Sequence, residues 1–103
     1  MKPTTQTITL DGGIYGPRTM PASVAGGLGV ARTSPLEWSV VHIGSGRIVH
    51  KTAQYGTKRD ALAAMSRLLA LDVPWGDPDP RVGALRAALE HNHRLILAAI
   101  KGE

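Results

Sequence analysis

The chain has 103 residues, with 12 Lys and Arg against eight Asp and Glu, a formal net charge of +4 and no cysteine. This length fits one small domain, and the lack of cysteine excludes disulfides, thiol catalysis and cysteine-ligated zinc. The positive charge favours contacts with anions such as DNA phosphates, although a charge of this size also simply keeps a small domain soluble. With no signal-like segment at the N-terminus and no apolar run of the ~20 residues that a membrane span needs, we expect a cytoplasmic protein without a membrane partner.

Residues 1–35 combine one strand pattern with a segment rich in glycine and proline. The alternation in TQTITL, residues 5–10, indicates a short strand. The segment from residue 11 to residue 35 accommodates turns or an irregular strand but not a long helix, because glycine and proline interrupt regular structure. We therefore predict a long loop or mobile arm after the first strand.

The stretch EWSVVHIGSGRIVHK, residues 37–51, is the clearest strand signal in the chain. β-branched residues flank a Gly-Ser-Gly run at residues 44–46, which predicts a hairpin because glycine tolerates the positive φ of a tight turn. A two-residue turn would place His42 opposite Val49, whereas a longer loop would shift this register. A third short strand is expected near residues 52–55.

A helical period follows the hairpin. Thr57 is the expected N-cap, with Asp60 three residues later as in a capping box. At about 100° per residue one apolar stripe appears. Its members are Ala61, Leu62, Met65, Leu68 and Leu69.

The proline-rich run VPWGDPDP, residues 73–80, must end this first helix. Asp79 and Pro80 are placed as the N-cap and first residue of a last helix that continues from Arg81 to Ile100. The apolar stripe of that helix consists of Val82, Leu85, Leu89, Ile96 and Ile100.

These elements predict an α+β fold in which a small antiparallel sheet, made of the β-hairpin plus the N-terminal strand, packs on two C-terminal helices. We expect a single domain overall. Residues 1–35 form its Gly/Pro-rich N-terminal strand and loop, and residues 36–103 form its ββαα core.

The pentapeptide EHNHR, residues 90–94, contains a His-Asn-His string that suggests a metal site. On a helix, however, His91 and His93 point roughly 200° apart. Two helical ligands of one metal need a spacing of three or four residues. We therefore expect no metal, and we place Asn92 and His93 beside a packing seam with the first helix or with a second copy. No nucleophile motif or paired carboxylates appear, so we expect neither an enzyme nor a cofactor.

Basic residues along the hairpin and the following helix form the leading candidate site. A β-ribbon fits the DNA major groove, where it would read bases while neighbouring cations hold phosphates. We assign readout to Arg47, His50 and Lys51, and phosphate contacts to Lys58, Arg59 and Arg67. The alternative is an ordinary solvated surface with scattered charge.

Two resemblances lie in residues 37–75. The chain is similar to small uncharacterised actinobacterial and actinophage proteins that combine a Trp-x-Val-x-His strand, a Ser-Gly turn and a Thr-x-Arg-x-Ala helix. The same region resembles, more weakly, the arm-type DNA-binding domain of tyrosine integrases, through the match of Thr57, Lys58 and Ala61. The residues that match the first group are Trp38, Val40, His42, Ser45, Gly46, Thr57, Arg59, Ala61, Asp72 and Trp75.

We therefore expect a small non-enzymatic phage or mobile-element protein that contacts DNA through its basic hairpin and helix. The alternative is a protein-interaction module, a homodimer that modulates a host protein. This alternative is based on two features: the core has few aromatic residues, and Trp75 is expected to be an exposed anchor for a partner. The expected interface residues are Trp75, Leu89, Asn92, His93, Ile96 and Ile100.

Overall fold

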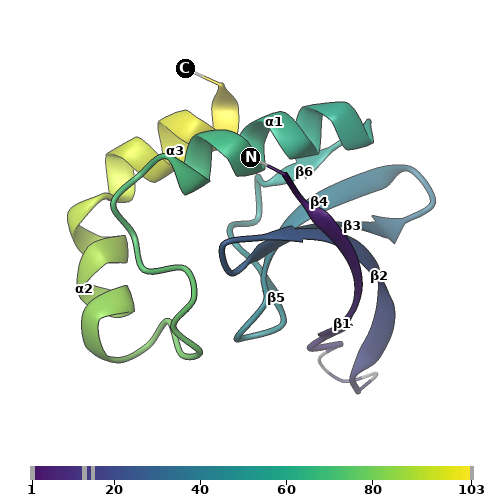
Figure 1. The fold of residues 1–103 in the computed structure, drawn as a ribbon, viewed down its shortest axis with the longest axis horizontal. Helices are drawn as coiled ribbons and strands as arrows, with labels where there is room; N and C mark the ends of the chain where they lie inside the picture. Colours follow the sequence, from purple (N-terminus) through teal and green to yellow (C-terminus); the bar gives the residue numbers. More distant parts are fainter. Residues whose placement is uncertain (1, 13, 15, 103) are drawn as a thin grey trace.

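The computed structural model describes residues 2–12, 14 and 16–102, and it has an α+β fold with an antiparallel six-stranded sheet and three helices (Figure 1). The predicted fold class is confirmed. The sheet order is β1-β2-β3-β4-β5, and β6 also pairs with β4. The elements are β1 (Thr4–Leu10), β2 (Arg18–Ala25), β3 (Leu28–Ser34), β4 (Glu37–His42), β5 (Arg47–Ile48), β6 (Gln54–Tyr55), α1 (Lys58–Leu69), α2 (Gly83–His91) and α3 (His93–Lys101).

Half of the sheet lies where a loop was expected. Strands β2 and β3 occupy most of residues 11–35, so the prediction of a long loop or mobile arm there is wrong. Gly26 and Gly27 form the turn between these strands, with φ values of 57° and 89° that other residues rarely adopt. Pro21 lies opposite Thr7 of β1 but outside the stretch of β2 that pairs with β3, which covers residues 23–25, so on the β3 side its missing N–H costs no ladder hydrogen bond. Glycine and proline therefore mark local features of this segment, such as the turn, and do not make the whole segment a loop.

The hairpin between β4 and β5 has a longer turn than the two residues considered from the sequence. His42 pairs with Arg47, not with Val49, and Val41 pairs with Ile48. Four residues, 43–46, connect the strands. The expected third strand at residues 52–55 is present as β6, which pairs with the first half of β4.

The sheet curls until its two ends meet (Figure 1). The backbone N–H of Asp11, just after β1, donates to the carbonyl of Gly46 at 2.8 Å. The Arg47 Nε also lies 3.2 Å from the Asp11 carboxylate. Gly46 allows this approach, because a Cβ there would lie 2.9 Å from the Thr9 carbonyl oxygen. The result is an inner, concave face and an outer face on which α1 packs against β3, β4 and β6.

Both faces of the sheet are buried in part, because alternate strand residues point to opposite sides. Val40 packs on the helical side with Met65 and Leu68 of α1. Its neighbour Val41 packs on the inner side with Ile8 and other residues of β1 and β2. The inner cluster consists of Ile8, Leu10, Ala22, Ala31 and Val41.

Helix α1 follows the prediction, and its N-cap is confirmed. The Asp60 N–H donates to the Thr57 hydroxyl at 3.2 Å. In the expected stripe Ala61, Met65 and Leu68 are fully buried, and its two remaining leucines are partly buried.

The expected single helix over residues 81–100 is instead two helices that break at Asn92. The Asn92 side chain donates to the Ala88 carbonyl at 2.8 Å at this break. Asp79 does not cap α2, because its carboxylate binds the backbone N–H of Arg81 at 2.9 Å. Gly83, with a φ of 66°, then interrupts any helical path from Arg81 onwards. The helix therefore starts later than predicted, with Val82 in the capping position.

Trp75 anchors the segment between α1 and α2 inside the molecule. Its side chain is only 4% exposed. Its indole N–H donates to the Leu68 carbonyl at 3.0 Å. The prediction of an exposed Trp75 anchor is therefore wrong, because the polar edge of the ring finds its partner at the end of α1.

Candidate nucleic-acid interface

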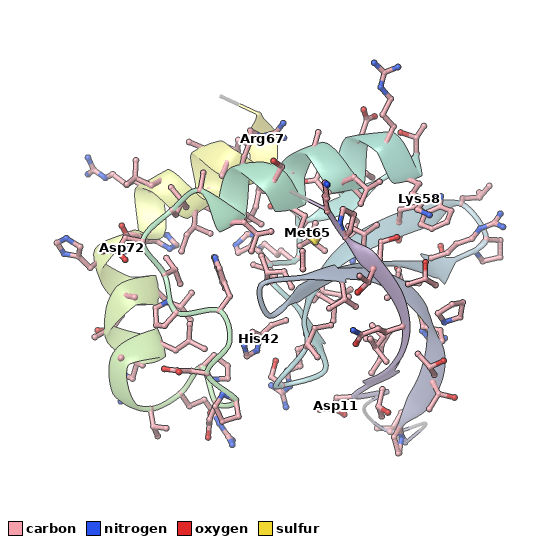
Figure 2. All side chains as sticks on the ribbon, in the orientation of Figure 1. Asp11, His42, Lys58, Met65, Arg67 and Asp72 are labelled. Carbon is pink, nitrogen blue, oxygen red and sulfur yellow. The ribbon has the colours of Figure 1, made fainter. Side chains whose placement is uncertain are left out.

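The six basic residues predicted to bind DNA do not form one surface. Arg67 is half-buried and donates from Nε to the Ala99 carbonyl at 2.7 Å, so it holds α1 against α3. Arg47 lies at the other end of the sheet and pairs with Asp11. Figure 2 shows Arg67, Lys58 and Asp11 in three separate parts of the molecule. Of the three residues expected to contact phosphates, only Lys58 and Arg59 remain candidates.

The hairpin that was expected to enter the major groove is not a free ribbon. β5 contains two residues, and the turn before it is covered by the segment that precedes α2. A Cβ on Gly44 in this turn would lie 2.6 Å from Pro78 Cα. His50 is half-buried and its Nδ1 lies 2.8 Å from the Thr52 hydroxyl, while Lys51 is exposed in the turn that follows β5.

A second arrangement brings cations and an aromatic ring together. Trp38 in β4 is partly exposed, and its ring centroid lies 5.8 Å from Lys58 Nζ and 6.0 Å from Arg32 Cζ. Both distances fall within the range of cation–π attraction. Arg59 is exposed next to Lys58 at the start of α1. We call Arg32, Trp38, Lys58 and Arg59 the Trp38 surface.

The strand register places Arg32 beside Trp38 in the Trp38 surface. Arg32 in β3 is the cross-strand partner of Trp38, and Tyr55 in β6 is its partner on the other side. The Tyr55 hydroxyl donates to the Ile100 carbonyl at 2.6 Å, which fixes this edge of the sheet to α3. Burial raises the pKa of Tyr55 above its usual value, an effect partly offset by the positive charge of Arg67.

The Trp38 surface has more positive than negative charges. Lys58, Arg59 and Arg32 carry three positive charges, and Asp60 in the first turn of α1 carries a negative one. The N-terminus of α1 adds a partial positive charge from its unpaired N–H groups. Leu36, in the turn between β3 and β4, is 84% exposed.

The predicted interface residues have mixed positions. Ile96 and Ile100 are buried in the helical-side core, and Leu89 packs against that core. Asn92 is partly buried at the helix break, and His93 is exposed. Helix α3 packs against α1 of the same chain. The exposed His93 does not take part in this packing, so its predicted place beside the seam is wrong.

Two members of the Trp38 surface, Arg32 and Trp38, were not predicted as site residues. Arg32 falls in the segment taken for a loop, and Trp38 was interpreted only as a strand former and as part of a resemblance. Within the described ranges, no group of three or more His, Asp or Glu side chains is arranged to hold a metal ion. None of the helices over those residues is both long and apolar enough to span a bilayer. No protein-family model, no curated protein and no solved structure matches this chain.

Proposed function

We propose that this protein is a small non-enzymatic DNA-binding protein that uses the Trp38 surface. The observation that carries the proposal is the pair of cations from separate elements, Arg32 and Lys58, on one partly exposed tryptophan ring. Proteins that bind nucleic acid without strong sequence preference combine cations for phosphates with aromatic rings for base stacking. The likeness to actinophage proteins is the basis for proposing a phage or mobile-element origin.

The geometry favours an unpaired strand over a duplex. Stacking on Trp38 requires an accessible base face, and base faces are covered in a duplex. The β4–β5 hairpin is held at its tip by the segment around Pro78, so it does not project as a ribbon into a groove. We therefore expect the protein to bind single-stranded DNA more tightly than the duplex of the same sequence.

Fluorescence anisotropy with a labelled oligonucleotide tests this proposal. Binding should weaken as salt rises, because each neutralised phosphate of a single strand contributes a slope of about −0.7 in log K against log salt. Lys58→Gln should remove roughly one such contact. Arg94→Gln, which removes an exposed charge on α3, is the matched control and should leave the slope unchanged. Lack of binding at low salt, or equal loss in both variants, contradicts the proposal.

A protein partner is the second candidate, and the exposed Leu36 favours it. Leu36 lies in the turn just before Trp38, and Arg32 is the cross-strand partner of Trp38. This combination of an apolar residue, a Trp and an Arg is typical of protein interfaces, where Trp and Arg are frequent hot spots. A pulldown from host lysate with and without nuclease separates the two functions. Partners lost after nuclease treatment indicate DNA, and retained partners that Leu36→Ser removes indicate a protein.

A further inference from the structure

The inner face of the curled sheet opens into a groove of about 640 Å³. Its lining comes from segments distant in sequence, because the end of β1 meets the start of β5 there. A volume of this size suits a small organic ligand, and the mouth of a curled β-sheet is a common place for one. The residues that line the groove include Leu10, Arg18, Thr33, Glu37, Ile48 and Gln54.

The contacts that close the sheet also fix the shape of the groove. The hydrogen bond from Asp11 to Gly46 and the contact between Arg47 and Asp11 fix its two walls relative to each other. All of its strands belong to one hydrogen-bonded sheet. A ligand would therefore meet a preformed site and would not have to order the chain around itself.

Charges of both signs line the groove. Arg47 and Asp11 form an ion pair with each other. Arg18 and Glu37 are exposed, and neither forms an ion pair with another residue that the structure describes. The only hydrogen bond of the Arg18 guanidinium to a described residue is a long one, 3.4 Å, to the Thr33 carbonyl. Two arginines and two carboxylates cancel, so the groove does not favour a ligand with a large net charge.

The floor of the groove is apolar, with hydroxyl groups at one side. Leu10 is 5% exposed and Ile48 is partly exposed. The Thr33 hydroxyl lies 2.6 Å from the Ser39 hydroxyl, and Ser39 is fully buried. An apolar side chain of a ligand would cover Leu10 and Ile48, while Thr33 and the exposed Gln54 offer hydrogen bonds to its backbone.

We propose that this groove binds a short zwitterionic peptide. The peptide carboxylate would pair with Arg18, the ammonium group with Glu37, and an apolar side chain would lie on Leu10 and Ile48. A guanidinium matches a carboxylate with two parallel hydrogen bonds, and a carboxylate accepts readily from an ammonium group. Glu37 and Trp38 are neighbours in β4 and face opposite sides of the sheet, so this site is separate from the Trp38 surface and does not depend on DNA binding.

Nuclear magnetic resonance tests the site with the dipeptide Ala-Leu added to the full chain. Amide shifts should move at the groove residues and saturate. Arg18→Gln and Glu37→Gln should each weaken binding about tenfold, since a hydrogen bond to a charged group contributes on that order. Arg94→Gln removes an exposed charge on α3, outside the groove, and should leave the affinity unchanged. All three positions are exposed, so the thermal midpoint should stay the same.

Capped peptides assign each charge to its partner. N-acetyl-Ala-Leu lacks the ammonium group, so it should bind the wild type about tenfold more weakly but bind Glu37→Gln no worse than the free dipeptide does. Ala-Leu amide should behave in the same way with Arg18→Gln. No shifts at roughly 10 mM peptide, where a millimolar site is mostly filled, would overturn the proposal. Shifts outside the groove would also overturn it. The same holds if capping a peptide weakens its binding to the matching variant as much as its binding to the wild type.

Discussion

His42 provides the sharpest test of how the fold is held together. It is 5% exposed and lies between the β4–β5 hairpin and the segment before α2 (Figure 2). Its Nε2 lies 2.8 Å from the carbonyl oxygens of both Trp75 and Asp77, so this nitrogen carries the proton. Its Nδ1 accepts from the Ser45 backbone N–H at 3.2 Å. One side chain therefore joins three backbone groups of two segments.

Replacing His42 with Ala leaves those backbone groups without their partner. A buried polar group left unsatisfied costs about 1–3 kcal/mol. Asp77 is partly exposed, so water replaces some of the lost bonds, and we expect a total loss of about 3 kcal/mol in the free energy of unfolding. For a domain of this size, 1 kcal/mol corresponds to roughly 4–8 °C, so the thermal midpoint should fall by more than ~10 °C.

His50→Ala is the matched control for this prediction. His50 is partly exposed, and among the residues that the structure describes its ring bonds only to Thr52, two residues away. Its removal should cost less than about 1 kcal/mol, as for a local, solvated hydrogen bond. Urea denaturation of both variants measures the two losses. Equal losses, or a loss below about 1 kcal/mol for His42→Ala, would refute the role of His42 in joining the two segments.

Four further substitutions test other contacts of the structure. Gly46→Ala should destabilise the fold by about 1–3 kcal/mol in urea denaturation, because its φ is 69° and its Cβ would crowd Thr9. Gly16→Ala should cost less, because Gly16 has a φ of 76° but no described residue within 4 Å of an added Cβ. Tyr55→Phe should cost about 1 kcal/mol through loss of its hydrogen bond. The raised pKa of Tyr55 gives stability that is present below pH ~10 and is lost as pH rises through the folded value, so Tyr55→Phe should flatten the alkaline limb of a stability profile. Arg47→Gln should change stability by less than about 1 kcal/mol, because its ion pair is exposed, as thermal unfolding would show.

The elements that the sequence predicts correctly have strong local signals. α1 begins with a capping threonine and keeps one apolar stripe, so its start and its buried face follow from local chemistry. β4 is rich in β-branched residues and lies next to a glycine-containing turn. For both elements, local preference and tertiary packing agree, and this agreement makes a prediction reliable.

The incorrect predictions have long-range causes. β2 contains two Ala residues and a Pro, types that are depleted in strands, and it becomes a strand because β1 and β3 pair with it. The helix break at Asn92 leaves the apolar spacing of Leu85, Leu89, Ile96 and Ile100 intact, so the periodicity does not reveal it. A helical pattern of this kind fixes the buried face without fixing where the helix is interrupted.

Neither candidate site could be assembled from sequence alone. The contact of Arg32 with Trp38 depends on the β3–β4 register, which shifts between Arg32 and Ser34. The groove around Arg18 and Glu37 depends on closure of the sheet between Asp11 and Gly46. Both result from pairings between distant segments, and such pairings are set by the whole fold and not by local preference.

Tryptophan fluorescence tests the central claim, DNA binding at the Trp38 surface, most directly. The chain has two tryptophans, and Trp75 is only 4% exposed, so a bound base can stack on Trp38 alone. Addition of an unpaired oligothymidine should quench the emission of the wild type at low salt, and the quenching should reverse as salt is added. Trp38→Phe should leave only the Trp75 emission, unchanged by the oligonucleotide. Wild-type emission that does not respond, or equal quenching in Trp38→Phe, would contradict the account.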